Sequence, residues 1–89
     1  MYKKKVKIMN SLGIHARPAS MIVKLASQFD SKVGLEKNDI GVNAKSIMGI
    51  LMLASEEGDE ITVKAEGKDE KKAVESIVKL IEKRKFDEE

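Results

Sequence analysis

The chain has 89 residues, 42% of them hydrophobic, and its 17 basic and 15 acidic residues leave a net charge of +2. This length allows one domain, residues 1–89, with a single core, and the absence of cysteine excludes disulfides, thiolate metal ligands and thiol catalysis. The balanced charge argues against a nucleic-acid partner. No apolar run approaches the roughly 20 residues of a membrane span, so we expect no membrane insertion. We expect a cytoplasmic protein without a cofactor or metal ion.

The first two elements follow from the spacing of apolar residues. Apolar and charged side chains alternate over residues 2–8, which predicts a strand with lysines on its solvated face. Residues 16–28 carry apolar side chains at i, i+3, i+4 and i+7, the spacing of one buried stripe on a helix. The stripe consists of Ile22, Leu25, Ala26 and Phe29.

A hairpin and a short helix come next. Two alternating runs, residues 32–37 and 39–43, meet at Asn38 and Asp39, which tolerate turn geometry. Ser46 then precedes an apolar run that predicts a helix capped by Ser46 and closed by Gly58. The hairpin residues expected to face inward are Val33, Leu35, Ile40 and Val42.

The last two elements are a strand and a helix. Residues 60–67 alternate in hydrophobicity, and Asp69 can cap a helix that reaches about Lys83. The order β-α-β-β-α-β-α predicts an α+β fold, with a four-stranded, mostly antiparallel sheet covered on one face by helices. The charged residues at about 85–89 are candidates for a frayed tail. Inward positions of the strand are Ile61, Val63 and Ala65, and those of the helix are Ala73, Val74, Ile77, Leu80 and Ile81.

Residues 10–20, NSLGIHARPAS, hold the only histidine, the only proline and one of two arginines. His15 lies where the Gly13 turn becomes a helix, and the first N–H groups of a helix have no intrahelical partner. Together with the positive end of the helix dipole they form a site for an anion, and they favour an uncharged, nucleophilic imidazole. Arg17 offers a fork that suits phosphate oxygens, and Pro18 loses no helical hydrogen bond in the first turn. These are the parts that phosphoryl transfer requires.

From residue type and spacing alone, other roles for His15 stay open. A single histidine at a helix start is often an ordinary surface residue or a local cap. Nucleotide cleavage is disfavoured, because neither the GxxxxGK[ST] pattern nor a kinase glycine loop is present. One histidine without cysteine argues against a metal site, and a serine nucleophile would need this same histidine as its base.

Two segments carry a resemblance to a known family. GIHARPAS at residues 13–20 and NAKSIMGI at residues 43–50 resemble motifs of HPr, the histidine-containing phosphocarrier of the bacterial sugar phosphotransferase system. The resemblance covers nearly the whole chain and is to the low-GC Gram-positive type. It implies an open-faced β-sandwich, which agrees with the predicted order of elements.

The resemblance also implies a mechanism. His15 would accept a phosphoryl group through Nδ1 from enzyme I, itself charged by phosphoenolpyruvate, and pass it to EIIA proteins or domains. Arg17 would steady the phosphate, and the backbone of Ala16 and Arg17 would bind it. The protein would then be a carrier that is modified stoichiometrically, and not a free-standing enzyme.

Ser46 has two interpretations. As a helix cap, its hydroxyl would accept a hydrogen bond from an early amide of the following helix. The resemblance instead makes it the target of the HPr kinase/phosphorylase, and a dianion is tolerated at a helix N-terminus. A regulatory binding module that acts through phosphorylated Ser46, docking to a catabolite control protein, is therefore the main rival hypothesis. A small phosphohydrolase is a distant third, because no positioned base is found.

The segment IMGILML, residues 47–53, predicts a docking surface, since it is apolar at almost every position. Ile50 and Leu53 fit the core stripe. We expect a small, transient interface and a monomeric protein. The outward residues of the surface would be Ile47, Met48 and Leu51, with Ser20, Lys24 and Lys45 at its rim to steer acidic partners. Apolar Met52 and bulky Leu12 depart from the family pattern and put partner preference in question.

Overall fold

The computed structural model describes residues 1–83, so the predicted fraying of residues 85–89 lies outside the described part of the chain. The elements follow the order predicted from the sequence, which confirms the α+β class. They are β1 (Tyr2–Lys7), α1 (Ala16–Ala26), β2 (Lys32–Lys37), β3 (Ile40–Asn43), α2 (Ile47–Met52), β4 (Glu60–Glu66) and α3 (Glu70–Glu82).

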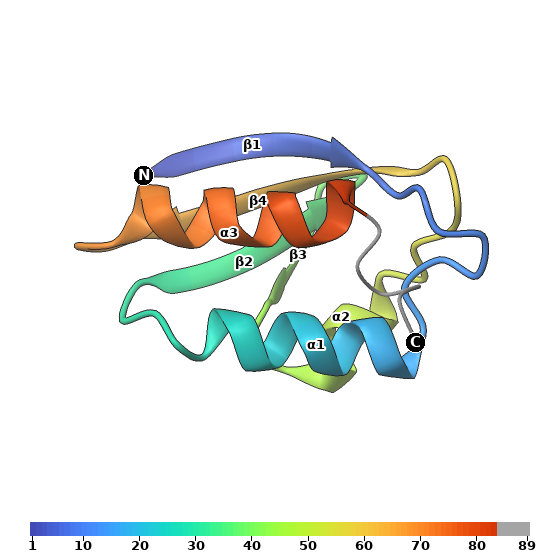
Figure 1. Ribbon diagram of the computed structural model, residues 1–89, viewed down its shortest axis with the longest axis horizontal. Helices are drawn as coiled ribbons and strands as arrows, with labels where there is room; N and C mark the ends of the chain where they lie inside the picture. Colours follow the sequence, from blue (N-terminus) through green and yellow to red (C-terminus); the bar gives the residue numbers. More distant parts are fainter. Residues whose placement is uncertain (84–89) are drawn as a thin grey trace.

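The four strands form one sheet in the order β1-β4-β2-β3, and every neighbouring pair is antiparallel. Figure 1 shows the helices gathered on one side of this sheet, with α3 over β1 and β4 and with α1 beside α3. The arrangement is the predicted open-faced sandwich. Within residues 1–83, no helix has the length and apolar character needed to cross a bilayer.

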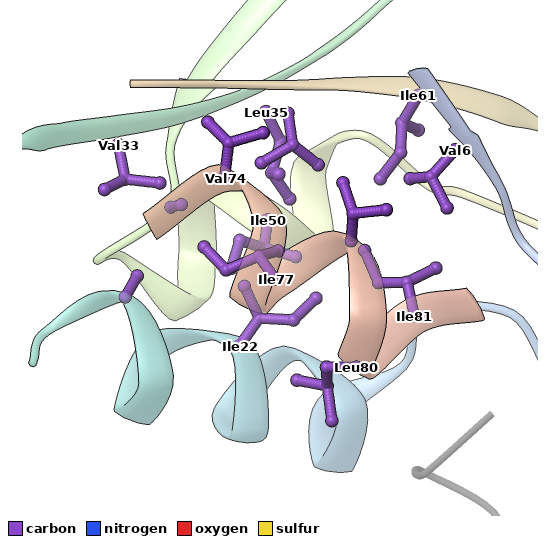
Figure 2. Close-up of a cluster of buried hydrophobic side chains, with 14 of the residues drawn as sticks. Val6, Ile22, Val33, Leu35, Ile50, Ile61, Val74, Ile77, Leu80 and Ile81 are labelled. Atoms are coloured by element: carbon purple, nitrogen blue, oxygen red, sulfur yellow. The ribbon is translucent and has the colours of Figure 1, made fainter. Parts of the chain in front are cut away.

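Alternate side chains of the strands meet the apolar stripes of the helices in one core (Figure 2). Val33 and Leu35 of β2 and Ile61 of β4 face Ile77 of α3 and Ile22 of α1, and all five are buried. Full burial of a side chain of this size contributes about 1.5–3 kcal/mol through the hydrophobic effect. The core therefore fixes α1, and with it the segment that carries His15, against the rest of the domain.

The hairpin between β2 and β3 has the predicted turn but an unexpected exposure. Asn38 and Asp39 adopt left-handed φ angles of 51° and 67°, which suit a tight two-residue turn. Val42 pairs with Leu35 and is half-buried. Ile40 pairs with Lys37 on the same face of the sheet as Leu35, but it is 61% exposed, so the expectation that it packs into the core is wrong. The physical reason is that β3 is the edge strand, whose hairpin end is covered less than the central strands.

The second helix is shorter than predicted. It ends at Met52, because Ala54 takes a left-handed φ of 48° that cannot continue a helix. The Nζ of Lys37 donates to the carbonyl oxygens of Leu53 and Ala54, at 3.1 and 3.0 Å, and so satisfies groups at the helix end. Gly58, with a φ of 92°, lies instead in the turn that leads into β4.

Asp69 holds the N-cap position of α3 as predicted, but its side chain does not cap that helix. The carboxylate accepts hydrogen bonds from the amides of Asp30 and Ser31, both at 3.0 Å, and from Ser31 Oγ. These bonds, with the Ser31 hydroxyl foremost, lower the pKa of Asp69. Asp69 thus ties the α1–β2 turn to the start of α3.

Candidate functional site

His15 occupies the N-cap position of α1, at the junction predicted from the sequence. Its backbone is extended, with φ −98° and ψ −166°, and its carbonyl oxygen accepts from the Ala19 amide at 3.0 Å. The side chain is exposed and makes no capping hydrogen bond. The imidazole is therefore accessible from solvent at the start of an eleven-residue helix.

The turn before His15 is fixed by short-range and long-range contacts. Gly13 donates its amide to the Asn10 carbonyl at 3.0 Å, and the Asn10 side-chain amide donates to the Gly13 carbonyl. Gly13 has a left-handed φ of 68°, and a Cβ at this position would overlap the Ser55 carbonyl oxygen. The same oxygen accepts from the amide of Ile14 at 2.9 Å. The turn therefore requires glycine, and it sets the direction in which the chain reaches His15.

The first turn of α1 is suited to an anion. Ala16 and Arg17 are its first two residues, and buried Pro18 follows without an amide to leave unpaired. No acidic residue lies in this turn, and the side chain of Arg17 is exposed. Amides at a helix start have no acceptor inside the helix, and the dipole adds partial positive charge there. Among residues 1–83, no three histidine or acidic side chains converge in a way that could hold a metal ion.

Ser46 caps α2, as the sequence predicts. Its Oγ accepts from the Gly49 amide at 3.1 Å, and its carbonyl oxygen accepts from the Ile50 amide at 3.1 Å. The residue is half-buried. Its hydroxyl oxygen is thus already engaged in holding the six-residue helix.

The outward face of α2 is apolar. Ile47 is 41% exposed and Met48 is 70% exposed, which agrees with the predicted docking surface. Leu51 is half-buried and packs against the core, so it is available only in part. Ile50 and Leu53 are buried, as predicted from the core stripe.

The polar residues predicted to rim this surface differ in their availability. Ser20 and Lys24 are exposed on α1, which packs against α2. Lys45 donates from Nζ to the Phe29 carbonyl oxygen at 2.8 Å, so its ammonium is engaged just beyond the end of α1. A role for any of the three in partner binding stays a prediction.

Comparison with known proteins decides the family. The family model described as the PTS HPr component phosphorylation site matches residues 2–83. The chain belongs to the HPr family. It is 47% identical to phosphocarrier protein HPr of Treponema pallidum over 89 residues, the full length of both chains. It is 43% identical to the HPr-like protein Crh of Halalkalibacterium halodurans, covering 93% of this chain and 99% of that one.

A solved HPr structure confirms the fold. The crystal structure of HPr from Thermoanaerobacter tengcongensis matches with a TM-score of 0.92 at 45% identity, covering 100% of this chain and 99% of that one. The resemblance drawn from the two HPr motifs is therefore confirmed. At the level of the family, the role is that of a phosphocarrier in the phosphotransferase system.

Two residues whose side chains hold nearby backbone in place were missed by the sequence prediction. Asn10 is 1% exposed and braces the turn through Gly13. Lys37 donates to the backbone that follows α2. The sequence did contain a sign that Lys37 has a special role. It shares one face of β2 with Val33 and Leu35, so a charged residue follows two buried apolar residues at alternate positions.

Two more apolar side chains are exposed that the predicted docking surface did not include. Leu12 is 77% exposed and Met52 is 76% exposed. Their sequence positions were noted as departures from the HPr pattern but not as contact residues. For Met52 the signal is its place four residues after Met48, which puts both on one face of α2.

Proposed function

We propose that His15 accepts a phosphoryl group through Nδ1 from phosphorylated enzyme I and passes it to EIIA proteins or domains of sugar transporters. The observation that carries this proposal is the exposed imidazole at the uncapped start of α1, within a chain whose match to the HPr family spans residues 2–83. In each cycle one P–N bond forms at His15 as the bond to the donor breaks. A second transfer then returns the imidazole unmodified.

The start of α1 supplies electrostatic stabilisation for this transfer. Charge spreads over the equatorial oxygens of the transferred group, and preorganised donors aimed at them lower the barrier. The amides of Ala16 and Arg17 and the guanidinium of Arg17 are the donors assigned to that task. The lone pair of an imidazole nitrogen attacks phosphorus. Because the attacking nitrogen carries no proton, no base is needed to activate it. Because the group is retained until the next partner arrives, the protein acts as a stoichiometric carrier.

Ser46 is assigned a regulatory role in the same proposal. A kinase of the HPr kinase/phosphorylase type would phosphorylate its Oγ, and the product would dock to a catabolite control protein. The position of Ser46 supports this role. A phosphate at the start of α2 would lie close to early helix amides, and the helix could accommodate it without unfolding. We expect the modification to weaken docking of enzyme I, raising the apparent KM while leaving the maximal rate unchanged.

The docking surface for these partners is assigned to α2 and the adjoining face of α1. It comprises an apolar centre and a basic rim, which suits transient binding of acidic partners by a monomeric carrier. Size-exclusion chromatography with light scattering tests the monomer. The assigned residues are Ser20, Lys24, Lys45, Ile47, Met48 and Leu51.

One labelling experiment separates the candidate functions. The protein is incubated with phosphoenolpyruvate and enzyme I, and intact mass is followed before and after mild acid. A carrier gains one acid-labile phosphate, and the His15→Ala variant gains none. Label at Ser46 from ATP and a serine kinase, with none at His15 from enzyme I, would favour the regulatory module. Repeated turnover of substrate without retained label would favour a phosphohydrolase.

A further inference from the structure

Residues 53–59, named the support loop here, connect α2 to β4 and back the turn that carries His15. Ser55 accepts the amide of Ile14, the residue immediately before His15, at 2.9 Å. Gly13 approaches the same Ser55 carbonyl so closely that a Cβ could not fit between them. The backbone that enters His15 therefore takes its position from the support loop.

Lys37 holds the support loop through its ammonium group. A lysine has three N–H donors, and Nζ of Lys37 meets three acceptors. These are the carbonyl oxygens of Leu53 and Ala54, at 3.1 and 3.0 Å, and Oδ2 of Asp59, at 2.9 Å. The Lys37 side chain is only 18% exposed, so these interactions are screened less than those of an open surface ion pair. Truncating the side chain would leave three polar groups without this partner.

The support loop contains a disfavoured backbone conformation at Ala54 and a carboxylate, Asp59, that binds both the loop and Lys37. Ala54 has a left-handed φ of 48°, which is disfavoured for a residue with a Cβ. Asp59 accepts from the Glu56 amide at 2.8 Å as well as from Lys37, and both bonds, the amide's foremost, lower the pKa of Asp59. The Asp59 carboxylate is therefore ionised at neutral pH and attracts the Lys37 ammonium.

We propose that Lys37 is a positioning residue for His15, acting through Ser55 of the support loop and the amide of Ile14; this rests on the proposed role of His15 as phosphoryl acceptor. The far end of the support loop is held independently, because the Gly58 amide donates to the Ile8 carbonyl at 2.8 Å. Loss of Lys37 therefore shifts the middle of the loop without detaching it from the sheet.

The test compares two lysine truncations. Lys37→Met removes the ammonium and keeps the aliphatic stem. Lys64→Met is the matched control, because Lys64 pairs with Glu36 at 3.6 Å, and strand alternation places both on the face of the sheet opposite to Lys37. With saturating enzyme I, we expect the maximal rate of phosphorylation to fall about tenfold in Lys37→Met at unchanged KM, less than the roughly hundredfold that a misplacement of 1 Å costs. Lys64→Met should match the wild type.

The single histidine of the chain supplies an independent readout. In Lys37→Met, the ring-proton NMR signals of His15 and the amide signal of Ile14 should move, whereas Lys64→Met should leave them in place. A folded Lys37→Met variant with wild-type rate and wild-type signals overturns the proposal. If that variant does not fold, Lys37→Gln, which removes the charge and shortens the side chain, replaces it, and a wild-type rate and spectrum there overturn the proposal equally. Failure of enzyme I to label the wild type would refute the phosphoryl role alone, while the NMR shifts would still decide the positioning role.

Discussion

The starts of α1 and α2 present similar local geometry and use it in opposite ways. Each helix begins after a residue with extended backbone, His15 in one case and Ser46 in the other. The Ser46 hydroxyl oxygen accepts from the Gly49 amide and serves the fold. The His15 ring makes no capping bond and is exposed. The residue proposed to accept the phosphoryl group from enzyme I is therefore the one whose side chain is not used as a helix cap.

Helix length explains the difference. The α1 helix has eleven residues and buries Ile22 and Ala26 in the core, so packing holds it without a side-chain cap. The α2 helix has only six residues, far fewer than an isolated helix needs to be stable. It is therefore held at both ends, by Ser46 at its start and by Lys37 just after its last turn. The longer helix can therefore do without a side-chain cap, whereas the shorter one uses the Ser46 hydroxyl as its cap.

Replacing His15 should give the largest functional effect with almost no structural one. We expect His15→Ala to abolish phosphorylation by enzyme I and to change the free energy of unfolding by no more than about 0.5 kcal/mol, because an exposed ring without a capping bond contributes little stability. Mass spectrometry and urea titration measure the two effects. A substantial loss of stability would show that His15 does serve the fold, and the contrast with Ser46 would fail.

Two glycine substitutions test how closely the turn before His15 packs against Ser55. Gly13→Ala is expected to cost about 3 kcal/mol, because alanine is disfavoured at a φ of 68° and its Cβ would overlap the Ser55 carbonyl oxygen. Gly58→Ala is the matched control, since its φ of 92° is also unfavourable but no atom lies within 4 Å of the added Cβ. That change should cost only about 1–2 kcal/mol. Equal losses in urea unfolding would mean that the contact with Ser55 is not restrictive.

Removing the Ser46 hydroxyl should show the opposite pattern to His15→Ala. We expect Ser46→Ala to lower the free energy of unfolding by about 1 kcal/mol, the usual cost of losing a serine N-cap, with transfer to His15 unaffected. Ser20→Ala serves as the control for stability, because Ser20 is exposed inside α1 and does not cap a helix. Unchanged stability in Ser46→Ala would contradict the structural role of this hydroxyl.

The sequence predicted those features that depend on local spacing. Strand alternation and helix stripes gave the element order, because period-2 and 3.6-residue patterns are visible without knowing the partners. The position of His15 was predictable for the same reason, since Gly13 and Pro18 mark a turn and a first helical turn close to it. The cap at Ser46 is likewise a signal within four residues of chain.

The features that the sequence did not predict depend on distant partners. The end of α2 depends on Lys37, whose bond to the Leu53 carbonyl spans 16 residues of sequence. The exposure of Ile40 depends on the strand order, which leaves β3 at the edge of the sheet. Asp69 was expected to cap α3, but its carboxylate oxygens accept from Asp30 and Ser31, 39 and 38 residues away. In each case the local pattern was correct, and a tertiary contact determined the outcome.

The smallest expected effect is a change in stability on replacing Asp69. This residue binds the turn after the C-terminal end of α1, away from the starts of α1 and α2. Hydrogen bonds, with the Ser31 hydroxyl foremost and the Asp30 amide next, hold the pKa of Asp69 below its ordinary value of 3.8. A carboxyl group whose pKa is lower in the folded state stabilises the fold above its unfolded pKa, and this contribution is lost as the pH falls through the folded pKa.

Asp69→Asn should therefore be less stable than the wild type at neutral pH, and the difference should shrink once the pH falls below about 3.8. Urea titrations at neutral pH and at about pH 3 measure it. A difference that stays constant would mean that the shape of the side chain, and not its charge, holds Ser31. Transfer to His15 should stay at the wild-type rate at neutral pH, because the α1–β2 turn and the reactive start of α1 lie at opposite ends of the same helix.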